Sequence, residues 1–202
     1  MTRIKLCGLR RPEDIEAVNE LRPEYIGFVF FPGSRRFVTP ETARTLKTAL
    51  RPGIRTVGVF VDAKPETAAS LLEDGTIDLA QLHGSEDEAY LAALRKRTDK
   101  PLIRAFRLRG PEDALRAQAS SADAILLDAG AGDGKAFDWR WLRQVERPYF
   151  LAGGLTPENA GRAVRELKPF AVDVSSGIET DGVKDIEKMR AFVRAVRMEN
   201  ET

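Results

Sequence analysis

The stretch Val57-Gly-Val-Phe-Val61 is a continuous apolar run rather than an alternation of apolar and polar residues, and Gly27-Phe-Val-Phe30 has the same character. Strands covered by helices on both faces have this pattern, and such strands build parallel sheets. Short apolar runs recur along the whole chain, at residues 4–7, 25–30, 56–61, 77–82, 102–106, 124–127, 149–152 and 171–174. We therefore predict eight parallel strands.

Five of the intervening segments begin with Pro followed by Glu, at Pro12, Pro40, Pro65, Pro111 and Pro157. Pro is favoured at the first position of a helix, where its missing N–H would have no partner in any case. A Glu beside it interacts favourably with the positive end of the helix dipole. The chain is thus predicted to alternate between strand and helix.

Eight strand–helix units in 202 residues average about 25 residues each, which fits a (β/α)8 barrel with short loops. An open, doubly wound sheet is the alternative. No G-x-G-x-x-G motif follows the first run, whereas loops suited to phosphate follow the seventh and eighth runs, as is common in barrels. We predict an α/β fold with one domain over residues 1–202, a (β/α)8 TIM barrel.

Composition narrows the class of partner. The 32 basic and 31 acidic residues are interspersed and leave a net charge of +1, so no global field attracts nucleic acid or a membrane. The single cysteine excludes an internal disulfide, and neither a signal peptide nor an apolar stretch of about 20 residues is found. We expect a cytoplasmic protein, monomeric or homodimeric, that binds a small molecule and ends in a frayed tail at residues 198–202.

Two of the apolar runs end in small residues, at Gly153-Gly154 and at Ser175-Ser-Gly177. Small residues let backbone N–H groups approach an oxyanion closely, and serine hydroxyl groups add further donors. The two loops together predict a phosphomonoester site. Other polar residues at the ends of the runs should meet on the same face, namely Cys7, residues 34–36, Asp62, Gln81, His83, Arg104 and Asp128.

Cys7 ends the first run beside Gly8. Taken alone it is a small, buried hydrophobic residue. Its place on the phosphate-binding face favours a general base, provided that a nearby cation or helix N-terminus lowers the pKa of the thiol.

Asp128 ends the sixth run and precedes the glycine-rich segment 129–135. It is either a cap or turn residue or, at a strand end before a loop that can close, a general acid with a raised pKa. Asp133 and Lys135 compete for that role and rank lower, because a loop tip positions a proton less well than a strand end does.

Of the neighbouring Arg35 and Arg36, one is expected to face solvent and the other to point into the site, where a guanidinium could pair with a carboxylate or phosphate of the ligand or lower the pKa of the thiol. His83 is the sole histidine, and a hydrogen bond at the strand end explains it at least as well as proton transfer does. Neither a metal cluster nor a nucleotide motif is present, so no cofactor is implied.

The chain resembles the phosphoribosylanthranilate isomerase family of tryptophan biosynthesis over nearly its whole length. The motifs that carry the resemblance are Lys5-Leu-Cys-Gly8, Gly27-Phe-Val-Phe30, Ser34-Arg-Arg36, Val57-Gly-Val-Phe-Val61, Gln81-Leu-His-Gly84, Phe137-Asp-Trp139, Leu151-Ala-Gly-Gly-Leu-Thr-Pro-Glu-Asn159 and Val172-Asp-Val-Ser-Ser-Gly-Ile-Glu179. Each motif is weak alone, but a generic phosphate-binding barrel would not carry all of them in register.

The resemblance implies an Amadori rearrangement of N-(5-phosphoribosyl)anthranilate to 1-(2-carboxyphenylamino)-1-deoxyribulose 5-phosphate, the third step of the tryptophan pathway, with neither metal nor nucleotide. It implies that Asp128 is the general acid, Cys7 the general base, and Arg36 the group that holds anthranilate. The remaining residues expected to bind substrate are His83, Gly153, Gly154, Asp173, Ser175, Ser176 and Gly177.

One segment departs from the family pattern. Members usually carry Gly-Gly-Thr-Gly after the sixth strand, whereas this chain has Gly130-Ala-Gly-Asp-Gly134, with Asp133 at the threonine position. A carboxylate there would repel an anionic substrate, so we expect Asp133 to point away from the ligand.

Two other functions compete with this one. A histidine-pathway isomerase performs the same rearrangement on an aminoimidazole carboxamide ribotide, but such enzymes typically have an aspartate at the end of the first strand, where this chain has Cys7. Dual specificity stays open. A barrel that binds phosphosugars without turnover would be expected to lack one member of the acid–base pair, and both are present.

Overall fold

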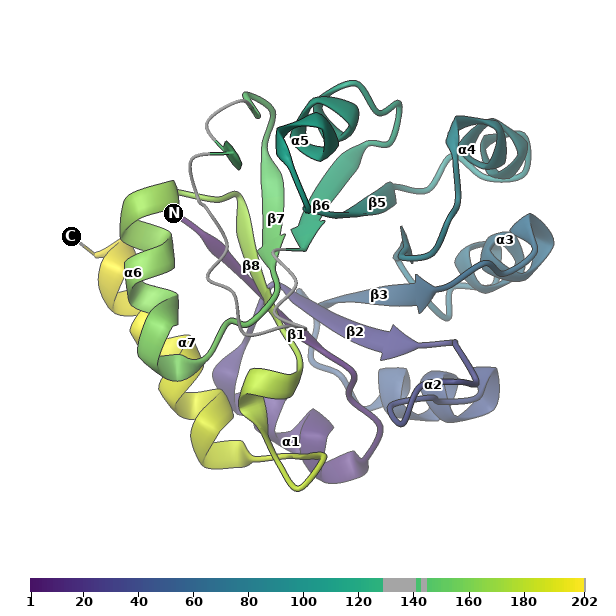
Figure 1. Ribbon diagram of the computed structural model, residues 1–202. Helices are drawn as coiled ribbons and strands as arrows, with labels where there is room; N and C mark the ends of the chain where they lie inside the picture. The colour runs from purple at the N-terminus through teal and green to yellow at the C-terminus, as the bar shows by residue number, and fades with distance from the viewer. Residues whose placement is uncertain (129–140, 143–144, 202) are drawn as a thin grey trace.

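The computed structural model describes residues 1–128, 141–142 and 145–201, and within them eight parallel strands close into a barrel in chain order (Figure 1). The strands are β1 (Arg3–Cys7), β2 (Tyr25–Val29), β3 (Arg55–Phe60), β4 (Leu79–Leu82), β5 (Leu102–Arg107), β6 (Ala124–Asp128), β7 (Tyr149–Ala152) and β8 (Ala171–Val174). The predicted TIM barrel is confirmed, and each strand overlaps one of the eight apolar runs.

Helices surround the barrel, and five of them begin at the predicted Pro residues. These are α1 (Pro12–Leu21), α2 (Pro40–Thr48), α3 (Pro65–Glu73), α5 (Pro111–Gln118) and α6 (Pro157–Leu167). Two further helices of the described residues, α4 (Glu88–Arg95) and α7 (Ile186–Asn200), instead begin after an aspartate whose carboxylate accepts hydrogen bonds from backbone N–H groups of the first turn.

Side chains on each strand alternate between two apolar environments, which explains why the runs are continuous. One set fills the barrel interior and includes Tyr25 and Phe150, whose rings pack edge to face at 5.3 Å. The alternate residues, such as Leu6 and Phe28, are buried between the sheet and the helices. Both faces of the sheet are therefore covered mainly by apolar side chains, as the sequence pattern predicted.

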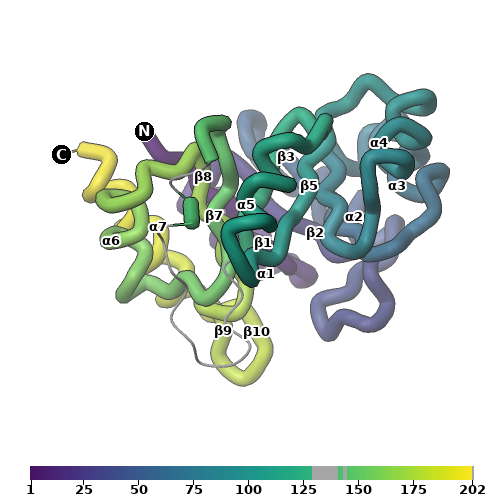
Figure 2. The backbone as a smooth tube through the Cα atoms, turned by 45° about the horizontal axis from the view of Figure 1, so that its top comes forward, coloured from purple at the N-terminus to yellow at the C-terminus, as the bar shows by residue number. Residues whose placement is uncertain are grey.

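A short antiparallel hairpin follows β8, and the sequence analysis did not predict it. After one turn of 3-10 helix, η2 (Ser176–Ile178), the chain forms β9 (Glu179–Thr180) and β10 (Val183–Lys184). Asp181 and Gly182 make the turn between them, both with positive φ. The hairpin projects from the body of the barrel (Figure 2).

The expectation of a frayed C-terminal tail is wrong for residues 198–200, which belong to α7. The side chain of Asn200 accepts a hydrogen bond from Thr2 N at 2.7 Å and donates one to Thr2 O at 2.9 Å. This contact joins the last helix to the start of β1. Within the described ranges, no helix has the length and apolar character needed to cross a membrane.

Candidate active site

Cys7 is the last residue of β1, and its side chain lies in the barrel interior with Val29 and Val59. Its neighbour in register on β2 is Gly27. A Cβ atom at that position would lie 2.5 Å from Cys7 Sγ, so the glycine makes room for the thiol. Burial raises the pKa of the Cys7 thiol above its ordinary value, although nearby lysines oppose the shift.

Lys5 and Asp173 form a buried ion pair next to Cys7. They are neighbours in register on β1 and β8, and Lys5 Nζ lies 2.9 Å from each carboxylate oxygen of Asp173. Burial alone would lower the pKa of Lys5, but the Asp173 carboxylate outweighs that effect and the pKa is raised. Lys5 thus contacts both oxygens of Asp173, and the expectation that Asp173 binds substrate stays a prediction.

The Glu179 carboxylate, on β9, holds three cations. Its Oε1 accepts from Arg36 Nε at 2.6 Å and from Lys184 Nζ at 2.7 Å. Its Oε2 accepts from Arg36 Nη2 and Arg35 Nη2, each at 2.8 Å. Burial opposes ionisation of Glu179, but the charge-assisted bonds from Arg36 and Lys184 prevail and lower its pKa to about 2.

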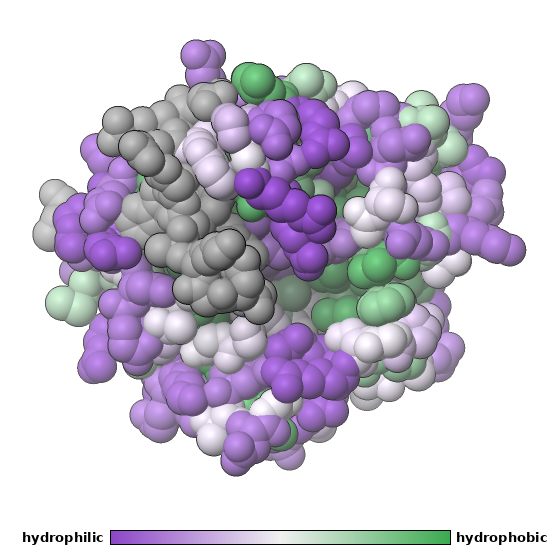
Figure 3. Space-filling view, in the orientation of Figure 1, coloured by the Kyte–Doolittle hydropathy of each residue, from purple (hydrophilic) through white to green (hydrophobic). Residues whose placement is uncertain are grey.

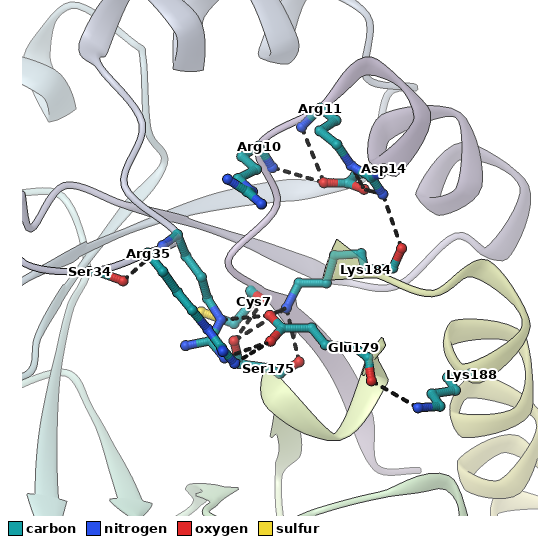
Figure 4. Close-up of polar contacts among 11 residues, drawn as sticks. Cys7, Arg10, Arg11, Asp14, Ser34, Arg35, Ser175, Glu179, Lys184 and Lys188 are labelled. Atoms are coloured by element: carbon teal, nitrogen blue, oxygen red, sulfur yellow. Dashed lines mark hydrogen bonds and ion pairs between the residues drawn. The ribbon is translucent and has the colours of Figure 1, made fainter. Parts of the chain in front are cut away.

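Lys184 connects this carboxylate to the thiol-bearing strand (Figure 4). Its ammonium donates to Ser175 O at 2.9 Å and lies 3.3 Å from Ser175 Oγ. That hydroxyl in turn donates to Cys7 O at 3.1 Å. Lys5, Glu179 and Lys184 are not among the site residues predicted from the sequence, although the Asp-Gly pair at 181–182 is a hairpin signal that would have placed Glu179 and Lys184 together.

The expected division between Arg35 and Arg36 is observed. The Arg35 side chain is 60% exposed and that of Arg36 only 20%. Arg36, however, already pairs through two nitrogen atoms with a carboxylate of its own chain. A ligand would therefore meet the remaining end of the guanidinium, around Nη1.

Asp128 ends β6, and its Oδ2 lies 3.4 Å from His83 Nε2. The other ring nitrogen, Nδ1, lies 2.8 Å from Gln81 Nε2 of β4. The two ring nitrogen atoms thus face different partners, Gln81 on one side and Asp128 on the other. His83 thus contacts the candidate acid, and Cys7 and Asp128 end parallel strands at the same mouth of the barrel.

The two predicted phosphate loops lie against each other. A Cβ atom at Gly177 would be only 1.9 Å from Leu155 O, so the loop after β8 touches the backbone of the loop after β7. Gly153 and Gly154 both have positive φ, at 91° and 65°, where glycine is favoured. Asn159 Nδ2 holds Gly154 O at 2.9 Å, and Ser176 is exposed beside Gly177.

Comparison with known proteins decides the family. Residues 4–195 match the family model described as N-(5'phosphoribosyl)anthranilate (PRA) isomerase. The chain belongs to this family. It is 44% identical to the N-(5'-phosphoribosyl)anthranilate isomerase of Endomicrobium trichonymphae, over 98% of this chain and 99% of that protein, and 44% identical to that of Acetivibrio thermocellus, over 98% and 96%. The resemblance inferred from the motifs is confirmed.

Solved structures of family members have the same fold. The phosphoribosyl anthranilate isomerase of Thermotoga maritima superposes with a TM-score of 0.89 at 35% identity, covering 98% of this chain and 100% of the other. A structure of a family member in complex with reduced 1-(o-carboxyphenylamino)-1-deoxyribulose 5-phosphate has a TM-score of 0.87 at 35% identity, with the same coverage. The Thermotoga maritima family member is described as dimeric.

Two other candidate residues are held by contacts with other parts of the chain. Arg104 alternates along β5 with Ile103, which faces the interior, and it pairs instead with Glu88 of α4 at 2.6 Å. Asp62 follows β3, and its Oδ1 accepts hydrogen bonds from the backbone and hydroxyl of Ser85, both at 2.7 Å. These contacts give both side chains structural roles.

Several predicted features lie outside the described residues: the segment 129–135 with Asp133 and Lys135, and the motif at 137–139. Among the side chains that the structure does describe, no three of His, Cys, Asp and Glu are grouped as metal ligands. Hydrophobic side chains gather beside β2 and β3 on the face shown in Figure 3. In the loop after β2, Phe31 and Phe37 are both partly exposed close in sequence to Arg36.

Proposed function

We propose that the chain, as one barrel domain over residues 1–202, catalyses the Amadori rearrangement of N-(5-phosphoribosyl)anthranilate. The observation that carries this proposal is the placement of a thiol and a carboxylate at one mouth of the barrel, next to two touching loops of phosphate-binding character, in a member of this family. The product is 1-(2-carboxyphenylamino)-1-deoxyribulose 5-phosphate.

Asp128 acts as the general acid. It protonates the ring oxygen of the ribosyl group, and the C1–O bond breaks to give an open-chain Schiff base between C1 and the anthranilate nitrogen. The imidazole of His83, whose Nε2 lies 3.4 Å from Asp128 Oδ2, faces the carboxylate that forms when the proton leaves.

Cys7 acts as the general base. Its thiolate removes the proton from C2, the electrons pass into the Schiff base, and an enolamine results. Protonation at C1 and loss of the C2 hydroxyl proton then give the ketone. The reaction is an internal redox change in which C1 is reduced and C2 oxidised, so it requires no external oxidant or reductant.

Binding groups hold the two ends of the substrate. The loops with Gly153, Gly154, Ser175, Ser176 and Gly177 surround the phosphate with backbone N–H and hydroxyl donors. At the other end, the anthranilate carboxylate meets the Nη1 side of Arg36, the side opposite to its contacts with Glu179. The exposed rings of Phe31 and Phe37 lie in the same loop, where they can pack against the aromatic ring.

The proposed cellular location follows from the role of Cys7 as the general base. A catalytic cysteine must remain a free thiol, and a reducing compartment keeps it so. We therefore retain the cytoplasmic location expected from the sequence.

The test is a fluorescence assay that follows the loss of phosphoribosylanthranilate, generated in the cuvette from anthranilate and phosphoribosyl pyrophosphate. Wild type and Cys7→Ser are measured side by side. We expect turnover in the wild type and a sharp fall in the variant. Absence of turnover in a folded wild-type protein would contradict the proposal, and the aminoimidazole carboxamide ribotide would then be the next substrate to assay.

A further inference from the structure

The positive and negative charges of the side chains around Cys7 are unequal in number. Within the described part of the chain they are the carboxylates of Asp173 and Glu179 and the cations of Lys5, Arg36 and Lys184. The Lys184 side chain is only 2% exposed and that of Glu179 only 4%. This group therefore carries three positive charges and two negative charges when Cys7 is a neutral thiol.

The contacts identify which cation lacks an anion of its own. Lys5 has both oxygens of Asp173, and Arg36 binds both oxygens of Glu179. Lys184 shares Oε1 of Glu179 with Arg36, and its other contacts are the neutral oxygens of Ser175. A buried charge without full compensation is costly, so this site favours a further negative charge close to Lys184.

Cys7 is placed to supply that charge. Ser175 Oγ lies 3.3 Å from Lys184 Nζ and donates to the main-chain carbonyl of Cys7 at 3.1 Å, so Lys184 lies close to the residue that bears the thiol. Lys184 interacts with the Cys7 thiol through its charge, whereas Lys5 is hydrogen-bonded to the thiol. An ionised Cys7 would make the group three positive and three negative. We propose that Lys184 is a positioning residue that stabilises the thiolate form of Cys7, and this rests on the proposed role of Cys7 as the base.

Burial leaves the pKa of Cys7 above its ordinary value, and the neighbouring ammonium groups act against that shift. Burial raises the pKa of Cys7, Lys5 and Lys184 lower it, and Asp173 raises it. Burial likewise lowers the pKa of Lys184, an effect that the neighbouring Glu179 and Cys7 oppose. The β9–β10 hairpin therefore provides one of the two ammonium groups that make a buried thiol usable as a base.

Arg11, which precedes α1, holds the main chain of Lys184. Lys184 O accepts a hydrogen bond from Arg11 Nη2 at 3.0 Å, and Arg11 is itself paired with Asp14. Lys188, one turn into α7, is exposed and donates to Glu179 O at 2.8 Å. Lys188 is thus a matched control, an exposed cation that contacts the same hairpin.

The experiment measures the ionisation of Cys7 directly. Because the chain has a single cysteine, the rate of iodoacetamide alkylation, followed by mass spectrometry as a function of pH, reports on this thiol alone. The alkylation midpoint is the pH at which the alkylation rate of Cys7 is half of its maximum. We expect Lys184→Met to raise this midpoint by about one pH unit, which slows alkylation at neutral pH about tenfold. Lys188→Met should leave the midpoint unchanged.

A variant that removes a negative charge instead of a positive one distinguishes an effect of charge from a general structural change. Glu179→Gln removes a negative charge from the same group, so it should lower the midpoint, whereas a general loosening of the site would move both variants in the same direction. If Lys184→Met does not fold, Lys184→Gln carries the same test, because its amide can still donate to Ser175 O. Circular dichroism and thermal unfolding establish that each variant is folded.

The outcomes distinguish this inference from the proposed function. An unchanged midpoint in a folded Lys184→Met or Lys184→Gln would overturn the inference, and so would equal shifts in Lys184→Met and Lys188→Met. Since alkylation needs no substrate, a wild type without isomerase activity would overturn the proposed function instead. Where turnover is present, the rising limb of the kcat–pH profile should move upward by the same amount as the alkylation midpoint.

Discussion

Arg36 and Glu179 form an ion pair through two contacts, Nε to Oε1 at 2.6 Å and Nη2 to Oε2 at 2.8 Å, although 143 residues separate them in the chain. The pair joins the loop after β2 to the hairpin after β8, and β1 lies between these two strands in the barrel. Two parallel bonds fix the plane of the guanidinium. The end that we assign to anthranilate is thereby oriented before any ligand binds.

Glu179 should make stability depend on acid pH. Its pKa in the folded protein is lowered from 4.5 to about 2. A carboxylate with a depressed pKa stabilises the fold fully above its unfolded-state value, and this contribution is lost as the pH falls from 4.5 towards 2. The shift corresponds to about 3 kcal/mol.

Urea unfolding of wild type and Glu179→Gln, measured at neutral pH and at about pH 3, tests this. The variant should be less stable at neutral pH, because Arg36 and Lys184 lose their carboxylate. It should also lose less stability on acidification than the wild type does. Equal losses in the two proteins would contradict the assignment, since the other carboxylates are common to both.

Cys7→Ser should lower kcat by roughly 10²–10⁴, the usual contribution of a general base, because a serine hydroxyl at this position is not ionised near neutral pH. Folding and KM should change little, since the two side chains are close in size. Steady-state kinetics and thermal unfolding measure these quantities. Near wild-type turnover in the serine variant would mean that another group removes the C2 proton.

Asp128→Asn should also lower kcat by roughly 10²–10⁴, because the amide cannot donate a proton to the ring oxygen. The matched control is Asp62→Asn, in the loop just after β3, whose carboxylate contacts Ser85. We expect near wild-type kinetics for this control. An Asp128→Asn effect confined to KM would make Asp128 a binding group rather than the acid.

Gly177→Ala should separate the two phosphate loops. The new methyl group would lie 1.9 Å from Leu155 O, a backbone atom, so the loop must move. We expect a loss of about 1–3 kcal/mol in unfolding free energy and a rise in KM of about tenfold or more.

The control for this variant is Gly161→Ala, within α6. There the first atom that a methyl group meets is Glu199 Oε1 at 3.3 Å, the end of a flexible side chain. Alanine at this position should stabilise the protein by about 0.5–1 kcal/mol and leave KM unchanged. Similar KM values for Gly177→Ala and wild type would show that the contact between the loops is not needed for phosphate binding.

Local sequence patterns were enough to predict most of the barrel. The run at 149–152 coincides with β7, and Pro12 and Pro157 are the first residues of α1 and α6. Such signals succeed because burial on both faces of a strand and the missing N–H of proline act within a few residues. The tail at 198–200 was predicted wrongly because its order depends on Asn200 contacting Thr2, at the other end of the chain.

The sequence by itself determined the alternation of strands and helices, the family, and the residue types at the strand ends, including Cys7 and Asp128. Only the tertiary structure decided the charges around them. Arg36 is paired with Glu179, Asp173 with Lys5, and Lys184 lies beside Ser175. The physical reason is distance along the chain: strand and helix signals are local, whereas these ion pairs join β1, β8, the loop after β2 and the hairpin, which closure of the barrel alone brings together.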